Sequence, residues 1–421
     1  MTENEPVEKP QSGDARFDAV VAGGSFVGLS LALALARCAP AGFRVAVVDR
    51  APPRAAAGSD GRASALSAAS CRLLEVLDVW PRLADEAQPI LDIDITDSRL
   101  TAPVRPLFLH FDTALERGAP AAYMVENARL GEALAAVAGE TAGVTLLAPE
   151  TVDGFDVDLH GVRVRLGGGG TLSGRLLVAA DGRRSALRRR AGIKTIGWSY
   201  PQTGIVTTVA HEKPHEGRAV QHFLPAGPFA ILPLRGDRAS LVWSEERSAA
   251  ERIMALDDEG FLAELTRRFG HKLGGLRLAG PRQAYPLDLH IARSFVADRL
   301  ALVGDAAHGV HPLAGQGLNI GLRDVAALTE VVVEALRLGL DPGGAAVLAR
   351  YERWRRFDSA FSAVAMDALN RLFSNDSEAL RATRAFGLSV VDRLPPVKDF
   401  FVREAAGLTG DLPRLLRGEP V

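Results

Sequence analysis

The sequence predicts an α/β protein in which a parallel-sheet domain is interrupted by an antiparallel sheet and followed by a helical C-terminal segment. Three features of the 421 residues carry this prediction. A βαβ pattern occupies 17–49, with an apolar run, a glycine turn, a Leu/Ala-rich stretch and a second apolar run. Strand-like runs separated by Pro/Gly turns occupy 205–243. A buried strand at 300–303 then leads through a glycine-rich run into a long helix at about 318–338.

The elements between these landmarks follow from local patterns. We expect a helix at 62–77, another near 127–137, and short strands across 144–178 with a hairpin turn at Gly167–Gly170. A helix at about 258–269 interrupts the antiparallel region. The predicted domains are a disordered leader at 1–16, a nucleotide-binding domain at 17–85, 113–195 and 291–340, a substrate domain at 86–112 and 196–290, and a C-terminal helical segment at 341–421.

Composition excludes several classes of protein. Hydrophobic residues make up 47% of the chain and charged residues 24%, as in ordinary globular proteins, and the net charge of −2 gives no field that attracts nucleic acid. The two cysteines, Cys38 and Cys71, form no CxxC pair and no disulfide framework. We find neither a signal peptide nor an apolar run of about 18 residues. We therefore expect a cytoplasmic protein, with peripheral attachment to the inner membrane left open.

The first motif is the turn Gly23–Gly28, which joins the first strand to the first helix. A dinucleotide-binding turn needs glycine where the backbone turns sharply, approaches the pyrophosphate and lets the helix pack on the strand. Ser25 replaces the middle glycine of the pattern, and its hydroxyl can donate to phosphate. Asp49 follows about 20 residues later, where a carboxylate accepts from ribose hydroxyls and repels a 2′-phosphate.

Two further motifs follow strands later in the chain. A buried strand at 176–180 ends in Asp181-Gly182, and a second one ends in Gly304-Asp305. Asp305 is placed to bind ribityl hydroxyls. The run Gly315-Gln316-Gly317 then lets backbone N–H groups approach a flavin ring as a helix begins, and that helix end stabilises negative charge on the reduced ring.

In this order and spacing, the three motifs resemble the class A flavoprotein monooxygenases with the para-hydroxybenzoate hydroxylase fold. The resemblance covers roughly 17–410 and is strongest to the ubiquinone-biosynthesis hydroxylases. It also draws on Arg62–Ser67, Gln221-His222-Phe223, Gly227-Pro228 and His308–Pro312. The departures are Ser25 and Asp49, the latter where Glu is usual. The candidate FAD-binding residues are Gly23, Ser25, Gly28, Asp49, Arg62, Asn127, Asp181, Gly182, Gly304, Asp305, Gly315, Gln316, Gly317 and Asn319.

The resemblance implies a Rossmann-like FAD-binding domain and an FAD-dependent monooxygenase. NAD(P)H is then the expected transient electron donor, and O2 reacts through a flavin C4a-hydroperoxide to hydroxylate an aromatic ring. Pro312, Gly315 and Gln316 are expected to line the flavin face, and no side-chain base is assigned. The implied substrate is a polyprenylated phenol or quinone precursor. Its tail implies contact with a membrane surface or a biosynthetic complex, although the C-terminal helices can equally form a cap on the core.

Other functions stay open on the residues alone. The same chemistry on a small soluble aromatic, a reductase without oxygen insertion, and a non-catalytic FAD-binding subunit each fit the motifs. A flavin halogenase fits less well, because Gly197–Pro201 does not match the Trp-x-Trp-x-Ile-Pro motif of that group. No metal site is expected, because His308 and His311 have no third ligand at metal spacing.

Overall fold

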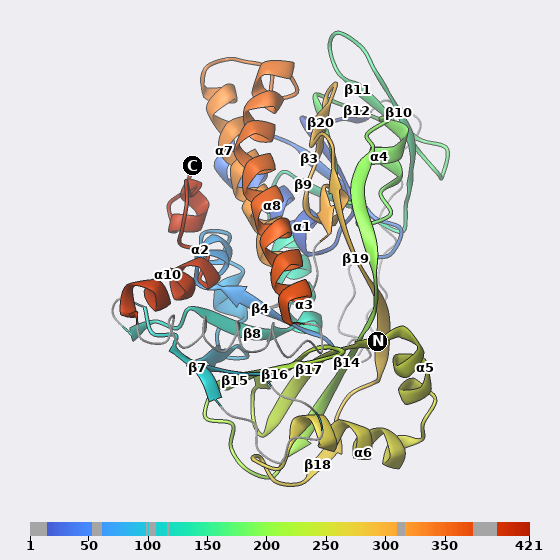
Figure 1. Ribbon diagram of the computed structural model, residues 1–421. Coiled ribbons are helices and arrows are strands. Elements are labelled where there is room, and N and C mark those ends of the chain that lie inside the picture. Colours follow the sequence, from blue (N-terminus) through green and yellow to red (C-terminus); the bar gives the residue numbers. More distant parts are fainter. Residues whose placement is uncertain are drawn as a thin grey trace, which may run out of the picture.

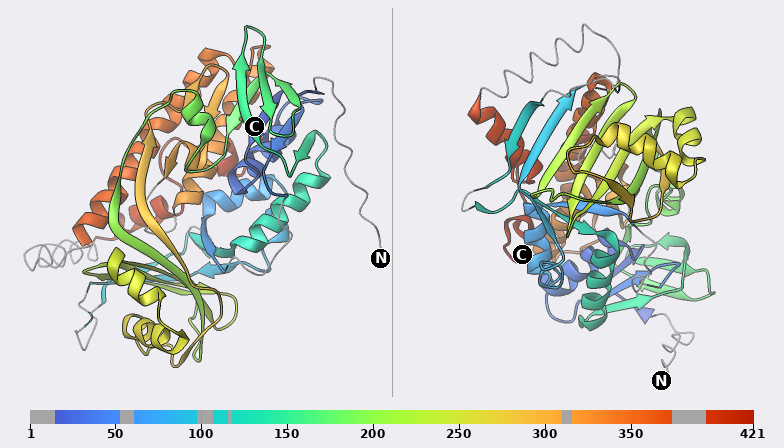
Figure 2. Two further views of the ribbon diagram at one scale, coloured as in Figure 1. Left: turned by 90° about the vertical axis from the view of Figure 1, so that its right-hand side faces the viewer. Right: turned by 90° about the horizontal axis from the view of Figure 1, so that it is seen from below.

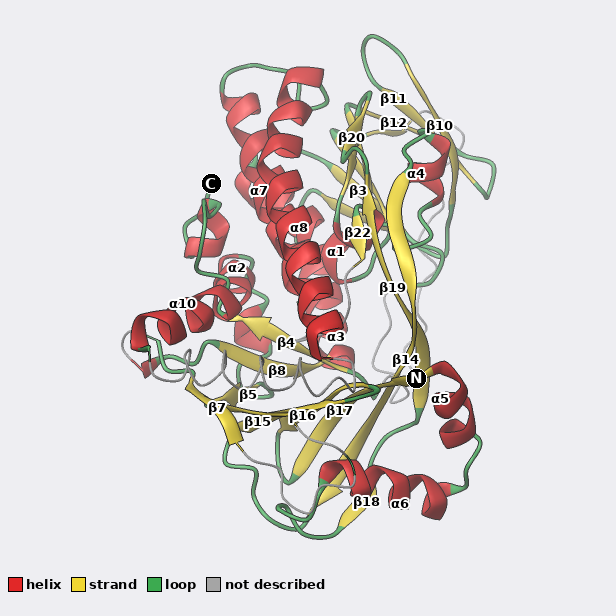
Figure 3. Cartoon of the chain, viewed as in Figure 1, coloured by secondary structure: helices red, strands yellow, loops and turns green. Residues whose placement is uncertain are grey.

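The described residues form four β-sheets, with helices packed around the parallel sheet and against one face of the largest sheet (Figures 1 and 3). The computed structural model describes residues 15–52, 61–97, 100, 107–115, 118–309, 316–373 and 394–421. The predicted leader lies outside these residues up to position 14. Its last two residues do not match the prediction, because Ala15–Arg16 form the short strand β1, which pairs with a later strand.

A six-stranded sheet forms the centre of the upper half in Figure 1. Its order is β20 (Val296–Ala297), β21 (Leu300–Leu302), β13 (Leu176–Ala179), β2 (Ala19–Ala22), β3 (Val45–Val48) and β9 (Val144–Leu147), all parallel except β20. Every residue of β2, β3, β13 and β21 is buried. Burial on both faces explains why these strands are continuous apolar runs in the sequence.

Helices pack around this sheet and give it its core. α1 (Phe26–Cys38) packs against α3 (Asn127–Glu140) and against α7 (Gly317–Arg337), and α7 packs in turn against α8 (Ala345–Phe373). Small residues such as Ala32 and Ala34 are fully buried in α1, which lets the helix lie close to its neighbours. The βαβ start, the helix near 127–137 and the long helix after the glycine run are therefore confirmed.

The second large sheet is antiparallel for most of its width and forms the lower half of the molecule in Figure 1. Its order is β22 (His308–Gly309), β19 (Gln283–Ala292), β14 (Thr195–His211), β17 (Arg238–Glu246), β16 (Gly227–Leu234), β15 (Arg218–Leu224), β6 (Asp92–Asp97) and β7 (Leu107–Asp112), with β18 (Leu276–Leu278) beside β14. It contains strands from both segments that the sequence assigns to the substrate domain. The long strands β14 and β19 connect it to the upper half (Figure 2).

Two helices cover one face of this sheet. α6 (Asp258–Phe269) matches the predicted helix, and its N-cap Asp257 accepts from the Gly260 amide at 2.8 Å. α5 (Arg247–Met254) was not predicted. Only two of its residues, Ala250 and Ile253, are buried, so its sequence lacks a clear apolar stripe.

Two small sheets complete the β structure. One contains β1, β12 (Thr171–Gly174), β11 (Val162–Leu166) and β10 (Val152–Val157); the other contains β4 (Ala63–Ser67), β8 (Ala122–Glu126) and β5 (Gln88–Ile90). β4 corrects the predicted helix at 62–77. Its residues pair with β8, and only after Ser67 caps the chain through the Ser70 amide does α2 (Ala68–Val76) begin.

Short helices and the C-terminal part close the structure. They are η1 (Trp80–Arg82), α4 (Ala186–Arg190), η3 (Gly304–Ala306), α10 (Pro395–Ala405) and η5 (Arg414–Arg417). The predicted helical tail is present in α8 and α10. Within the described part of the chain, no helix has the length and apolar character needed to cross a bilayer.

Candidate functional site

The glycine turn between β2 and α1 is tightly confined. Gly23 has a φ of +111°, a conformation that favours glycine, and a Cβ there would lie 2.2 Å from the carbonyl oxygen of Ala180. At Gly28 a Cβ would lie 1.8 Å from the carbonyl oxygen of Gly23. A side chain at either position therefore forces the turn open. The two glycines let β2, α1 and the loop after β13 meet at one point.

Ser25 stands at the start of α1 with free bonding capacity. It is the N-cap, it is exposed, and its side chain makes no capping hydrogen bond. The first-turn N–H groups of a helix have no partner within the helix, and the helix dipole places positive charge at this end. This end of α1 can therefore accept phosphate groups.

Asp49 lies directly beside the turn, at the carboxyl end of β3. Its carboxylate accepts from the Gly24 amide at 2.5 Å and from the Ala51 amide at 2.9 Å. These bonds fix the carboxylate next to the phosphate-accepting helix end. An ionised carboxylate has about four acceptor positions, so capacity is left for ribose hydroxyls.

Asp181 follows β13, the neighbour of β2 on the other side. One carboxylate oxygen accepts from the amides of Ala186 and Leu187 at 2.8 and 3.3 Å. The other oxygen, Oδ1, is buried and has no hydrogen-bond partner among the described residues. Buried polar atoms are nearly always hydrogen-bonded, so this oxygen indicates a ligand or water at this point. Gly182 follows with a φ of +80° and no atom near its missing Cβ.

Gly304 and Asp305 form a 3-10 turn after β21. Gly304 has a φ of +57°, and a Cβ there would lie 3.2 Å from the Val27 side chain in α1. The Asp305 side chain is exposed at the same edge of the sheet that carries the glycine turn. The carboxyl ends of β2, β3, β13 and β21 thus bring four motifs together, as expected for ligand sites of parallel sheets.

A buried ionic network that the sequence did not predict supports this turn. The Asp324 carboxylate, on α7, accepts from the Gly304 amide at 2.9 Å, from His308 Nε2 at 2.6 Å and from Arg355 Nε at 2.8 Å. Asp324 is completely buried, and Arg355, on α8, is nearly so. Burial raises the pKa of Asp324, but the charges of His308 and Arg355 outweigh it and hold the pKa below its usual value.

The flavin-face prediction falls largely on residues that the structure does not describe. Pro312 and Gly315 lie outside the described residues, while Gln316 is the N-cap of α7 and Gly317 is its first residue. Asn319 lies within the first turn but is 4% exposed. Its side chain donates to the Ala65 carbonyl and accepts from the Ser67 amide and the Ser70 hydroxyl. The side chain therefore ties α7 to β4 and α2.

Arg62 and Asn127 lie together at the ends of β4 and β8. The Arg62 guanidinium is exposed and lies over the Tyr285 ring, 5.6 Å from its centre. Asn127 is buried, its amide donates to the Arg62 carbonyl at 2.9 Å, and its Oδ1 accepts from the Ser64 hydroxyl at 2.7 Å. Asn127 therefore anchors the strand end that carries Arg62.

The nine-stranded sheet presents different faces to its two sides. Strand side chains alternate, so Phe229, Ile231, Leu241 and Trp243 pack together under α5 and α6. The opposite face of β16 is directed towards α8, β5 and β8. We call it the inner face, because it lies towards the nucleotide-binding half.

Among the described residues, three polar side-chain atoms on the inner face are buried and have no hydrogen-bond partner. They are Nε2 of Gln221 and the hydroxyls of Ser240 and Ser244. Gln221 lies opposite Ala230 on the next strand, and Ala230 lies opposite Val242 on the strand after that. Ser240 and Ser244 are two residues before and after Val242. Because every second side chain of a strand points to the same side, Gln221 and both serines share one face of the sheet. A buried polar group left unpaired costs about 1–3 kcal/mol, so these atoms indicate a ligand or water on the inner face.

The residues present fit FAD. The glycine turn and the start of α1 can accept a pyrophosphate, Asp49 and Asp305 place carboxylates at the same sheet edge, and the Oδ1 atom of Asp181 has no hydrogen-bond donor among the described residues. Among the described residues, no three potential metal ligands lie together. Fold and site together define a nucleotide-binding flavoprotein.

Comparison with known proteins supports the assignment as a flavoprotein. Residues 16–362 match the family described as FAD binding domain. Ubiquinone hydroxylase UbiL of Rhodospirillum rubrum is 49% identical over 97% of this chain and 95% of its own. The 3-demethoxyubiquinol 3-hydroxylase of Escherichia coli is 35% identical over 92% of this chain and 98% of its own. The chain therefore belongs to the FAD-binding monooxygenase family that includes the ubiquinone hydroxylases.

Solved structures share the fold. The p-nitrophenol 4-monooxygenase PnpA of Pseudomonas putida superimposes with a TM-score of 0.77 at 20% identity, covering 94% of this chain and 99% of its own. Pseudomonas aeruginosa PqsL, solved with 2-aminobenzoylacetate, gives 0.74 at 25% identity, covering 88% and 100%. These structures confirm the predicted fold class, and the family match and the relatives confirm the FAD cofactor and the monooxygenase activity.

Proposed function

We propose that this FAD-dependent monooxygenase hydroxylates the aromatic ring of a ubiquinone precursor that carries a polyprenyl tail. The observation that carries the proposal is the 49% identity to a ubiquinone hydroxylase along nearly the whole of both chains. Bound FAD supplies the redox chemistry that activates O2. The protein holds the ring in place and excludes water. Neither task requires a side-chain base.

The nine-stranded sheet is the proposed substrate domain, and its inner face is the proposed wall of the substrate site. Its apolar positions, such as Ala230 and Val242, suit a ring face, and Gln221, Ser240 and Ser244 offer donors to ring oxygens. The FAD-binding residues predicted from the motifs form the other wall. We propose NAD(P)H as the electron donor, docking transiently.

Turnover by the FAD-loaded protein tests this function. The expected result is NAD(P)H oxidation that a prenylated phenol or quinol stimulates, with a hydroxylated product by mass spectrometry. Equal turnover of a short tail-free phenol would instead support a small soluble substrate. FAD reduction without a hydroxylated product would identify a reductase, and no reduction by any donor would identify a non-catalytic subunit.

We also propose that the C-terminal helices contact a bilayer surface, from which a prenylated substrate is taken. Phe357, Phe361 and Val364 are 79%, 61% and 65% exposed, and their spacing places them on one side of α8. Phe400 and Phe401 of α10 are also exposed. Such residues on a soluble surface mark a membrane or protein contact.

Charge supports the bilayer as the contact. On α8, basic residues lie beside the apolar stripe, namely Arg353, Arg356 and Arg371, and they outnumber the acidic residues of the helix. Apolar side chains bordered by cations match anionic lipid headgroups. Phe357→Ser with Phe361→Ser should reduce co-sedimentation with phosphatidylglycerol vesicles, whereas the exposed Leu159→Ser control should not. Unchanged co-sedimentation of the double variant would refute the contact.

A further inference from the structure

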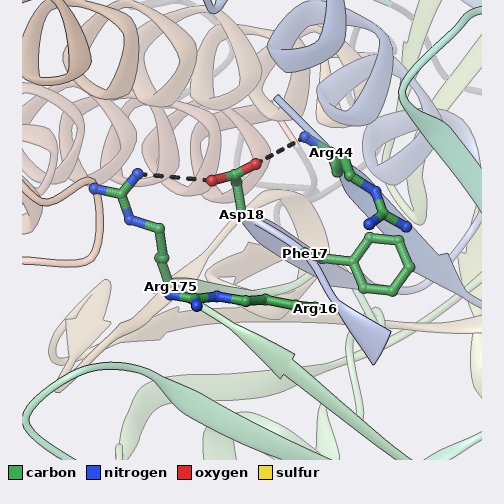
Figure 4. A pocket seen from close by; sticks show the side chains of 5 residues that line it. All are labelled: Arg16, Phe17, Asp18, Arg44 and Arg175. Carbon is green, nitrogen blue, oxygen red and sulfur yellow. Dashed lines mark hydrogen bonds and ion pairs between the residues drawn. The ribbon is translucent and has the colours of Figure 1, made fainter. Parts of the chain in front are cut away.

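Two adjoining cavities lie away from the cofactor site, at the opposite edge of the parallel sheet. The first has a volume of about 380 Å³ and is lined by Arg16, Phe17, Asp18, Arg44 and Arg175 (Figure 4). The second, of about 330 Å³, shares Arg16 and Arg175 with the first. We call the first cavity the arginine pocket.

The topology of the sheet assembles this pocket. Arg175, Asp18 and Arg44 each immediately precede a strand, namely β13, β2 and β3, which are neighbours and parallel. Their amino ends therefore carry a row of positive, negative and positive side chains. The candidate FAD residues follow the carboxyl ends of the same strands. Each strand has four residues, which separates the pocket from the FAD site by roughly 13 Å or more.

Positive charge exceeds negative charge in the pocket. Its lining has three arginines and one aspartate, which leaves two positive charges uncompensated. Asp18 is already engaged, because one oxygen accepts from the Arg44 amide at 2.9 Å and the other lies 3.6 Å from Arg175. Asp341 lies 3.7 Å from Arg175 but forms a closer pair with Arg299, at 2.8 Å.

The guanidinium groups are held in place yet keep free donors. Arg44 lies over the ring of the buried Phe17, 4.9 Å from its centre. Arg175 is held between Asp18 and Asp341, at separations longer than a charge-assisted hydrogen bond of about 2.7–2.9 Å. Within the described part of the chain, the side chains of Arg16, Arg44 and Arg175 donate no hydrogen bond. Like charges gathered around a cavity repel, and an anion relieves that repulsion.

We propose that the arginine pocket binds a phosphate group, as a second ligand site separate from FAD. A phosphate dianion matches the two uncompensated charges. A guanidinium can donate two hydrogen bonds to two oxygens of the same phosphate group. The cavity is larger than one phosphate group, so a phosphate ester fits. The phosphate belongs either to a soluble ester or to a lipid headgroup.

Calorimetric titration of the full-length, FAD-loaded protein tests the proposal. The probes are inorganic phosphate, glycerol 3-phosphate, and phosphatidylcholine vesicles with and without phosphatidylglycerol, at constant ionic strength. Arg44→Gln and Arg175→Gln should each weaken binding at least about tenfold, since each loses a bond to a charged group. Arg277→Gln, which removes an exposed arginine of β18, should leave binding unchanged. Flavin content checks that each variant is folded.

The outcomes distinguish a soluble phosphate ester from a lipid headgroup as the source of the phosphate group. Saturable binding of free phosphate or its ester, lost in Arg44→Gln, identifies a soluble ligand. Binding of phosphatidylglycerol vesicles alone, lost in the same variant, identifies a lipid headgroup. Vesicle binding is compared in the Phe357→Ser/Phe361→Ser background, so that the proposed bilayer contact of α8 does not contribute. No binding of any probe before Arg44 and Arg175 are replaced, or binding that Arg44→Gln and Arg175→Gln retain, overturns the proposal.

Discussion

Replacing Arg355 with methionine breaks the buried network beneath the Gly304 turn. Arg355 Nε lies 2.8 Å from Asp324, both groups are nearly inaccessible, and the second guanidinium nitrogen pairs with Asp358. Removing one partner of a buried ion pair costs about 3–5 kcal/mol, because the other charge stays buried. Against a total stability of about 5–15 kcal/mol, that loss is large.

Urea unfolding followed by circular dichroism measures the effect on the free energy of unfolding. Arg350→Met is the matched control, since Arg350 lies on the same helix but pairs with Glu334 at the surface, where such pairs contribute about 0–1 kcal/mol. A loss below about 1 kcal/mol for Arg355→Met, or an equal loss for the control, would refute the reasoning.

The network also determines how the stability loss in Arg355→Met changes with pH. The pKa of Asp324 is depressed in the folded state, so its contribution is full above its ordinary value of 3.8 and is lost as the pH falls through the folded-state pKa. Arg355→Met removes one of the two cations that depress the pKa. The stability difference between wild type and variant should therefore narrow in acid. A difference that grows as the pH falls would contradict the assignment.

Three further substitutions test the FAD site and the proposed substrate site. Gly28→Ala places a Cβ 1.8 Å from a carbonyl oxygen and should abolish FAD retention on purification; normal flavin absorbance would contradict the confined turn. Asp181→Asn changes the carboxylate that carries the unpartnered oxygen and should weaken FAD binding by about tenfold or more in a fluorescence titration; unchanged affinity would show that this oxygen does not face FAD. Gln221→Leu should raise the KM for the aromatic substrate several-fold at unchanged flavin content. Thr207→Val is the control, because Thr207 pairs with Leu241 and lies on the other face of the sheet, and its KM should not change. A KM for Gln221→Leu equal to that of the wild type would show that Gln221 does not belong to the substrate site.

Much of the nucleotide half could be predicted because its signals are local. The strand before Gly23 and the strand before Asp49 are buried on both faces, so each is a short apolar run that ends at a polar turn. The confinement of Gly23 and Gly28 explains why glycine occupies both positions. The apolar runs and the contact between Gly28 and Gly23 depend on residues close together in the chain, whereas the contact between Gly23 and Ala180 does not.

Contacts between distant segments could not be predicted. The stretch 63–67 was expected to be helical because Ala, Ser and Leu favour no strand, yet pairing with β8, almost 60 residues away, makes it a strand. Asp324 meets His308 and Arg355 only once α7 and α8 are packed. Asn319 stays a predicted cofactor residue, but the contact of its side chain with β4 could not be predicted because β4 itself was not.

Isotope labelling tests the central claim most directly. The FAD-loaded protein would receive NAD(P)H, a prenylated ubiquinone precursor and ¹⁸O2, and the extracted product would be analysed by mass spectrometry. We predict a product whose new ring hydroxyl carries a heavy oxygen atom. Donor oxidation that yields only hydrogen peroxide, or a product whose hydroxyl lacks the label, would contradict the assignment as a ring-hydroxylating monooxygenase.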